Sequence, residues 1–437
     1  MTTASPETAY ANPAPTMATA ARSIRDPRLD FFRGVAMFVI LISHTPYNAW
    51  SAWMPSQFGF SDATEIFVFC SGMASAIAFG RTFDRHGLAL GTARVAFRVW
   101  QIYWAHIALF LVLATFLAGI DATGWHPKAI YVGSLNLVQF FEDPAPLLIG
   151  LMTLSYVPNY FDILPMYMVL LAMMPVVVAL SRISLPLVFA LSAAMWLLAQ
   201  GALLEAFGLG HLHLNFPAEP WSDRTWYFNP FGWQLVFFTG FALIRGWIPA
   251  PQVRPGAIAL TAAFVLASLA VSVAGFRLFD SAIVKGVYTA VSGCTETGFG
   301  ACNPVFDWRD GNRPWFDKSS FAILHYVHFL AVAYLAWVLA GTRGRRLVAE
   351  GAGTLSRGWN EVVAVVMKVG QQSLAAFIAS MIIARVNGYL LDVIGRNWGT
   401  FALINMTGIG LLIACAYVAG WFKSQPWRAK PSAEAGA

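Results

Sequence analysis

The chain has 437 residues, of which 58% are hydrophobic and 11% are charged, and its mean hydropathy is +0.60. This balance excludes an ordinary soluble globular protein and indicates a polytopic membrane protein. The formal net charge of +6 is largely a topology signal, so the composition gives little support to a nucleic-acid-binding protein.

The first 28 residues are rich in Ala, Pro and Thr and contain no apolar stretch that would form a signal peptide. We therefore expect residues 1–24 to be a disordered cytoplasmic tail, and the first apolar helix to direct insertion. Residues 25–422 are predicted to form one all-α membrane domain, with a long external loop at 276–318. Residues 423–437 are predicted to form a second cytoplasmic tail.

Ten apolar segments are long enough to cross a hydrocarbon layer of about 30 Å, which takes about 20 helical residues. They lie near 29–49, 62–80, 97–119, 160–180, 185–206, 230–247, 255–275, 319–341, 370–392 and 400–422. Lys and Arg in alternate connections number 17 on the side of the N-terminus and 8 on the other side. Because cytoplasmic loops retain positive charge, both termini are predicted to face the cytoplasm.

The first apolar segment carries two ionisable residues, Arg33 and His44. A separation of eleven residues places them about 20° apart on one helix face and about 16 Å apart along it, with Asp30 in the same sector. Ionisable groups inside membrane helices are rare and usually line a wet cavity, so this stripe is a candidate site. The alternative is that Arg33 extends to lipid headgroups and His44 is a hydrogen-bonded core residue.

The second segment begins with Asp62 and Glu65, one turn apart on a helix. A short connection should bring them to the depth of His44, where a carboxylate could bind one ring nitrogen and leave the other as a base. Farther along the same segment, small residues are spaced for close helix packing at Gly72, Ala76 and Gly80.

Three later groups of polar and aromatic residues are predicted to lie at the same depth as His44. They are Asp162 with Tyr167; Trp226 with Asn229, Trp233 and Gln234; and His325 with His328. Each group alone is also compatible with helix capping or with satisfied core polar residues. Aromatic rings with amides and carboxylates suit a carbohydrate, although Trp and Tyr also anchor helices at membrane interfaces.

The four cysteines divide by location. Cys70 and Cys415 lie in apolar segments, whereas Cys294 and Cys302 lie in the long predicted external loop. In an oxidising compartment the loop pair is predicted to form a disulfide, with two free thiols as the alternative. The histidines lack the close spacing of metal ligands, so no metal site is predicted.

Several of these segments together resemble a known family. LDFFRGVAMFVILISH, FSDATEIFVFCSGMASA, FDILPMYMVLL, WYFNPFGWQ and VGQQSLAAF are similar, in this order, to the OpgC family, which belongs with the acyltransferase-three superfamily of membrane O-acyltransferases. The resemblance covers roughly residues 25–422. It implies about ten helices in a bacterial inner membrane, a cytoplasmic acyl-CoA donor and succinylation of periplasmic glucans. Arg33 and His44 match the functional Arg and His of the superfamily, whereas the cysteine loop is no part of the resemblance.

The sequence thus predicts an O-acyltransferase with succinyl-CoA or acetyl-CoA as co-substrate, no permanently bound cofactor and a glucan acceptor. His44 would be the base, oriented by Glu65 or Asp62, and the acyl-CoA would be bound by Arg33, Asp30, Arg94 and Arg98. The acceptor would be bound by the three groups of polar and aromatic residues, namely Asp162, Tyr167, Trp226, Asn229, Trp233, Gln234, His325 and His328. An acyl-enzyme relay, a homo-oligomer, a transporter and a scaffold remain open, although no inverted repeat supports a transporter.

Overall fold

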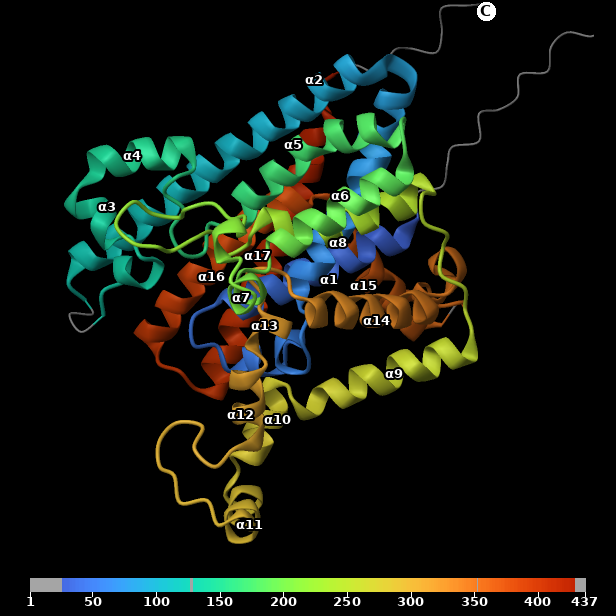
Figure 1. The fold of residues 1–437 in the computed structure, drawn as a ribbon. Coiled ribbons are helices and arrows are strands. Elements are labelled where there is room, and N and C mark those ends of the chain that lie inside the picture. The colour runs from blue at the N-terminus through green and yellow to red at the C-terminus, as the bar shows by residue number, and fades with distance from the viewer. Residues whose placement is uncertain (1–25, 126–128, 352, 429–437) are drawn as a thin grey trace, which may run out of the picture.

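The computed structural model describes residues 26–125, 129–351 and 353–428, and no β-strand is found among them. α1 lies in the middle of the helical bundle, and part of α2 runs along its edge, as Figure 1 shows. The longer helices are α1 (Pro27–His44), α2 (Ala63–Thr123), α5 (Ile163–Ser181), α6 (Leu185–Leu198), α8 (Pro230–Arg245), α9 (Pro255–Ala270), α14 (Ile323–Ala340), α15 (Thr354–Gln371), α16 (Ser373–Ile394) and α17 (Trp398–Ser424). The shorter helices are α3 (Val138–Glu142), α4 (Pro144–Thr153), α7 (Gly201–Ala206), α10 (Val273–Phe279), α11 (Ala282–Ser292), α12 (Pro304–Gly311) and α13 (Arg313–Phe316).

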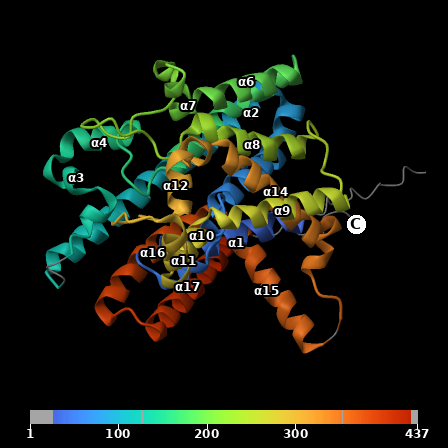
Figure 2. The same cartoon turned by 60° about the horizontal axis from the view of Figure 1, so that its bottom comes forward.

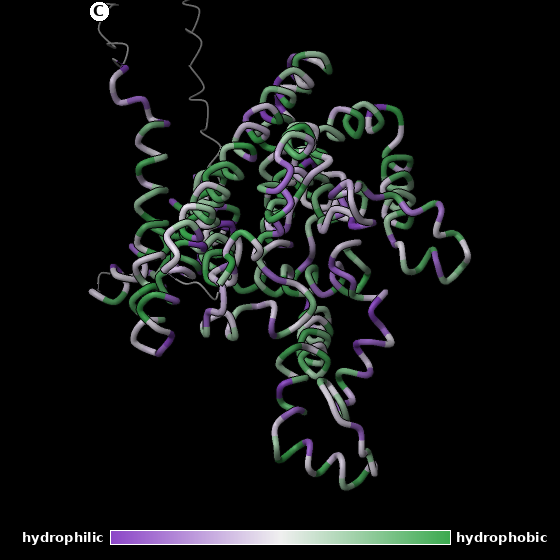
Figure 3. Tube along the Cα trace, turned by 90° about the vertical axis from the view of Figure 1, so that its left-hand side faces the viewer, coloured by the Kyte–Doolittle hydropathy of each residue, from purple (hydrophilic) through white to green (hydrophobic). Residues whose placement is uncertain are grey.

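The helices of the bundle are mostly apolar along their length, as the hydropathy colouring in Figure 3 shows. In the described part of the chain, five helices are long and apolar enough to cross a membrane, namely α2, α5, α14, α16 and α17. The bent pair of α9 and α10, with 47° between its axes, makes a sixth candidate. The chain is therefore an α-helical membrane protein, but the prediction of about ten spans is not confirmed.

Three features explain this lower number. α1 has 18 residues and carries Arg28, Asp30 and Arg33, while α6 and α8 have only 14 and 16 residues. The predicted spans 62–80 and 97–119 both lie in α2, which has 61 residues and one non-helical residue, Gly87, at φ 77°. Such a positive φ favours glycine, and the two halves of α2 run in different directions in Figure 1.

A close contact between α1 and α15 determines where α1 lies. A Cβ on Gly34 would be 2.0 Å from the carbonyl oxygen of Val366, and one on Gly370 would be 1.8 Å from that of Asp30. Only glycine allows the two backbones to approach so closely. The sequence prediction missed α15, which combines a partly exposed apolar face with polar residues and whose Thr354 end extends away from the bundle in Figure 2.

The predicted small-residue ridge of α2 does pack closely, and its partner is α8. A Cβ on Gly72 would be 1.9 Å from the carbonyl oxygen of Phe237, and one on Gly240 would be 2.3 Å from that of Phe69. Gly80 lies farther along the same contact, next to Arg245. The glycines therefore bring α2 and α8 together along the second half of α8, from Phe237 to Arg245.

The start of α1 and the end of α17 lie at one end of the bundle. Arg28 stacks over Trp337 near the end of α14 at 3.8 Å, and Lys368 lies 5.5 Å from the ring of Tyr417 on α17. The location of these two helix ends agrees with the prediction that both termini lie on the same side of the membrane. The assignment of that side to the cytoplasm stays a prediction. The predicted tail 1–24 and most of the tail 423–437 lie outside the described residues.

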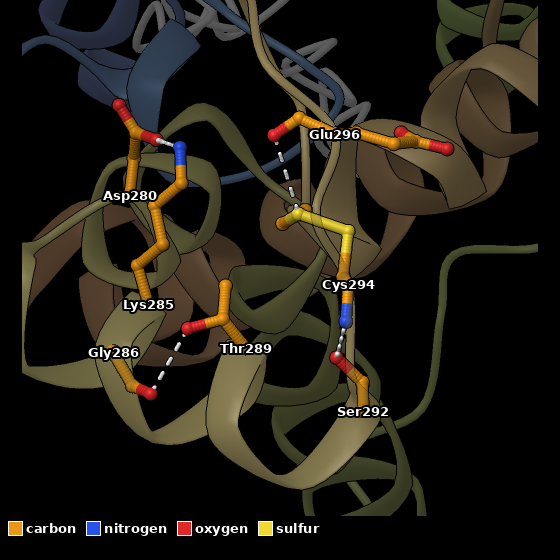
Figure 4. Close-up of a disulfide and its surroundings, with 8 residues drawn as sticks. Asp280, Lys285, Gly286, Thr289, Ser292, Cys294 and Glu296 are labelled. Carbon is orange, nitrogen blue, oxygen red and sulfur yellow. Dashed lines mark hydrogen bonds and ion pairs between the residues drawn. A yellow bond between two sulfur atoms is a disulfide. The ribbon is translucent and has the colours of Figure 1, made fainter.

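The segment 276–318 forms α11, α12 and α13 beside the opposite end of the bundle, and α11 projects from it at the bottom of Figure 1. Cys294 and Cys302 are joined by a disulfide, which is the pairing that the sequence predicts. Figure 4 shows the disulfide together with the ion pair between Lys285 and Asp280, whose Nζ and Oδ1 atoms are 3.0 Å apart. The bridge holds the loop that follows α11 close to α12.

Candidate functional site

A cavity of about 650 Å³ lies at the end of the bundle where α1 ends. Its wall contains His44 from α1, Phe67 from α2 and Phe377 from α16, together with residues from two connections. Those connections contribute Tyr160, Asp162, Arg224, Trp226 and Tyr227. The volume is in the range of pockets for small ligands, and the wall combines aromatic rings with charged groups.

His44 is the last residue of α1, because Pro46 disfavours a helical conformation at Thr45. Its Nδ1 lies 2.9 Å from the carbonyl oxygen of Ile40. Since a carbonyl can only accept, Nδ1 carries the hydrogen, and in the neutral ring Nε2 has the free lone pair. The ring packs edge-on against Tyr160, with centroids 5.0 Å apart. His44 is therefore oriented to accept a proton through Nε2.

The predicted contact between His44 and a carboxylate is not present. Asp62 forms an ion pair with Lys318 and caps α2, and Glu65 lies 3.1 Å from Nδ1 of His325. The orienting partner of His44 is the Ile40 carbonyl instead. A carboxylate and an imidazole do form a pair at this end of the bundle, but the imidazole belongs to α14.

The pair of Glu65 and His325 holds a proton in the protein interior. The Nε2 of His325 faces the carbonyl of Phe316 at 2.9 Å, so it is a donor. Its Nδ1 faces a carboxylate oxygen, so a proton must lie on one of these two atoms. Glu65 is fully buried and also accepts a bond from the backbone N–H of Asp62 at 2.7 Å. The pair therefore connects α2, α14 and the segment that precedes α14.

Arg33 and His44, which the sequence places on one stripe of α1, are not joined by the cavity. Arg33 donates a hydrogen bond to Ser373 of α16, one turn from Phe377. Phe377 stacks on Phe67 with ring centroids 5.7 Å apart, and both rings line the cavity, whereas Arg33 does not. In the described residues, the rings of Phe67 and Phe377 thus form an apolar floor of the cavity. This aromatic floor lies between His44, which is inside the cavity, and Arg33, which is outside it.

The other residues predicted to bind acyl-CoA do not line this cavity. Asp30 is buried near the start of α1. Arg94 is exposed and donates to Thr82 across the bend in α2, and Arg98 donates to Gln101 at 3.0 Å. The structure therefore does not bring Arg94 and Arg98 together with His44, and a role in binding the donor stays a prediction.

Among the predicted acceptor residues, Asp162 and Trp226 line the cavity. Asp162 accepts a bond from the backbone N–H of Tyr227 at 2.9 Å, which joins the start of α5 to the connection before α8. Tyr167 lies deeper and packs between Phe67 and Phe237. The first two residues are thus placed to contact a ligand, while Tyr167 supports the wall.

The cavity is not lined by Asn229, Trp233 or Gln234, and neither is a second, smaller cavity beside it. Asn229 caps α8 and donates to the carbonyl of Leu214 at 2.6 Å. Trp233 donates to the carbonyl of Lys318 at 3.1 Å, and Gln234 forms two hydrogen bonds with Ser192. These contacts hold the connections around the site in place, as helix caps and satisfied core groups do.

The two histidines of α14 have different environments. His325 lines a second cavity, whereas His328 is buried against Gly59 and Ser61. The backbone N–H of Ser61 donates to Nδ1 of His328 at 3.3 Å, so Nε2 carries the hydrogen, and this buried atom has no partner among the described residues. His328 therefore packs the loop before α2 and lies outside both cavities.

Three residues at or next to the cavity are not among the site residues predicted from the sequence. Arg224 is held at its wall by Glu219 and by the carbonyl of Val157, at 2.9 and 2.7 Å. Tyr160 is covered by the guanidinium of Arg385 at 4.0 Å. Arg385 lies inside a predicted span, so the rarity of ionisable groups in membrane helices was a signal that could have found it.

The second cavity, of about 290 Å³, shares Tyr227 and Ser319 with the first. Burial alone would lower the pKa of Lys318 in its wall, but the carboxylates of Asp62 and Glu65 raise it above the ordinary value. Lys318 is therefore charged. Within the described part of the chain, no three side chains of His, Cys, Asp or Glu are grouped to bind a metal ion.

The fold and the cavity define an α-helical membrane protein with a cavity lined by aromatic and charged side chains at one end of its bundle. The chain belongs to the OpgC family, because a family model described as OpgC protein matches residues 25–424. This membership indicates a glucan-modifying transferase that acts on osmoregulated periplasmic glucans. No significant match was found among curated proteins or among solved structures.

Proposed function

We propose that this protein is a membrane O-acyltransferase of the bacterial inner membrane. It moves a succinyl group from cytoplasmic succinyl-CoA to hydroxyl groups of periplasmic glucans, and acetyl-CoA is the alternative donor. The observation that supports this proposal most is the orientation of His44. Its Nδ1 is occupied by the Ile40 carbonyl, and its ring lines a cavity with room for a sugar residue.

In the proposed reaction, Nε2 of His44 accepts the proton of a glucan hydroxyl. The oxygen attacks the thioester carbonyl, the new ester bond forms, and the carbon–sulfur bond breaks. The CoA thiolate leaves and is protonated by the imidazolium, which restores neutral His44. Arg224 in the cavity wall offers a positive charge for the oxyanion that forms on the carbonyl.

The donor would approach from the end of the bundle at which α1 begins. CoA is strongly anionic and does not cross a hydrocarbon layer, so only its pantetheine arm would extend toward His44. Arg33 lies below the aromatic floor and would act as a counter-charge for the donor. The rings of Phe67 and Phe377 would have to separate for the thioester to reach the cavity, so the structure corresponds to the closed state of the proposed passage.

Transfer of radiolabelled acyl groups to glucan by the reconstituted protein tests the proposal. We expect His44→Ala to lower the rate by about 10²–10⁴-fold, because a positioned base contributes a factor of this size. His211→Ala is the matched control, since His211 is an exposed histidine outside both cavities. An unchanged rate in His44→Ala would refute the role of the base. Export of unmodified glucan without covalent labelling would instead identify a transporter.

A further inference from the structure

The charges around the second cavity are unequal. Its wall contains three permanent cations, Arg309, Arg313 and Lys318, but only two carboxylates, those of Asp62 and Asp317. Lys318 forms an ion pair with Asp62. Asp317 accepts bonds from the backbone N–H and the hydroxyl of Ser320, at 3.0 and 2.7 Å. In the described residues, neither arginine has a carboxylate within ion-pair distance.

The guanidinium of Arg309 is held in a fixed position. It donates to the carbonyl of Val271 at 2.8 Å and lies over the ring of Phe316 at 4.7 Å. Phe316 in turn stacks on Trp308, with 8° between the ring planes. One of the five N–H groups of Arg309 is thus used by the protein, and the others remain for a ligand. Burial lowers the pKa of Arg309, which indicates a partly desolvated charge that an anion would stabilise.

We propose that the second cavity is a subsite for a carboxylate group, which Arg309 and Arg313 bind. Tyr227 and Ser319 line both this cavity and the first cavity, which contains His44. Because the two cavities are adjacent, that carboxylate can be the free end of a succinyl group. It can equally be an acidic substituent on the acceptor. The identity of the anion rests on the proposed function, whereas anion binding itself does not.

Binding of succinate to the purified full-length protein in nanodiscs of neutral lipid tests the subsite without any turnover. We expect Arg309→Ala/Arg313→Ala to weaken binding at least about tenfold, because it removes charge-assisted hydrogen bonds. Arg277→Ala is the matched control, since Arg277 is an exposed arginine of the same segment outside the cavity. Arg313→Ala alone removes an exposed side chain with no hydrogen bond among the described residues and should weaken binding without affecting folding. Unchanged succinate binding in both variants would overturn the subsite.

Transfer assays with the double variant distinguish the two sources of the carboxylate. Loss of transfer from succinyl-CoA but not from acetyl-CoA assigns the carboxylate to the acyl group. Loss with both donors, on anionic but not on neutral glucan, assigns it to the acceptor. If the wild-type protein binds succinate through these arginines but transfers no acyl group, the proposed function fails while the subsite stands. If transfer occurs and is unaffected in every combination, the subsite plays no part in transfer, and the assignment of its carboxylate to the acyl group or to the acceptor fails.

Discussion

At the scale of single residues, the backbone determines how His44 is oriented. The sequence predicted a carboxylate partner, because Asp62 and Glu65 lie at the right depth. Both carboxylates have other partners, however. The stretch Asp62-Ala-Thr-Glu65 forms a capping box that begins α2, which is a local signal visible in the sequence. His325 comes from 260 residues farther along the chain, so its contact with Glu65 was not visible there.

The buried pair of Glu65 and His325 makes a sharp prediction about stability. We expect Glu65→Ala to lower the free energy of unfolding by about 3–5 kcal/mol, because it leaves a buried imidazole without its partner. Glu65→Gln should be much less harmful, since its amide can donate to Nδ1 of neutral His325 and still accept from the N–H of Asp62. Thermal unfolding in nanodiscs would measure both variants. Equal losses for the two variants would show that restoring these two hydrogen bonds does not restore stability, and would contradict this account of the pair.

At the scale of helices, glycines determine which elements meet. The ridge on α2 was predictable from its spacing, because Gly72, Ala76 and Gly80 recur every four residues. The partner helix was not predictable, since a ridge of small residues favours close approach by any helix. α15 was missed for a different reason: its apolar residues lie on one face only, so it never reaches the hydropathy of a membrane span.

The contact between α1 and α15 can be tested with two glycines of one helix. Gly370→Ala would place a Cβ 1.8 Å from the backbone of Asp30, and we expect it to destabilise the protein by about 1–3 kcal/mol, as overpacking does. Gly358→Ala is the matched control, because a Cβ there has no atom within 4 Å. It should be neutral or stabilising by up to about 1 kcal/mol, since alanine favours helices. A similar thermal midpoint for both variants would contradict the close packing.

The aromatic floor is also a property of helices rather than of single residues. Phe67 of α2 and Phe377 of α16 are each ordinary apolar residues in the sequence, and nothing there predicts that they stack. Their contact depends on how α2 and α16 both pack on α1. The predicted stripe from Arg33 to His44 is therefore interrupted by residues that α1 does not contain.

At the scale of the whole molecule, the arrangement makes a prediction about topology. The disulfide loop and the end of α17 lie at opposite ends of the bundle, so they should face opposite sides of the membrane. After mild reduction of intact cells, we expect a membrane-impermeant maleimide to label Cys294 and Cys302. A tag at the C-terminus should become accessible only after permeabilisation.

The double variant Cys294→Ser/Cys302→Ser is the control for this experiment. Its labelling should be lost, because Cys70 is buried and Cys415 is only half-exposed within α17. Labelling of the wild-type cysteines only in permeabilised cells would show that the loop faces the cytoplasm. That result would reverse the predicted orientation, and with it the side from which the donor and the acceptor would enter.

The sequence by itself determined the membrane class, the all-helical fold and the polar end of the bundle that contains His44. It could do so because hydropathy, helical periodicity and capping act over a few turns of one chain segment. Only the tertiary structure decided that Glu65 pairs with His325 and that Phe67 stacks on Phe377. It also decided that Arg309 and Arg313 line one cavity. These contacts join residues far apart in sequence, and their geometry follows from helix packing, which no local pattern encodes.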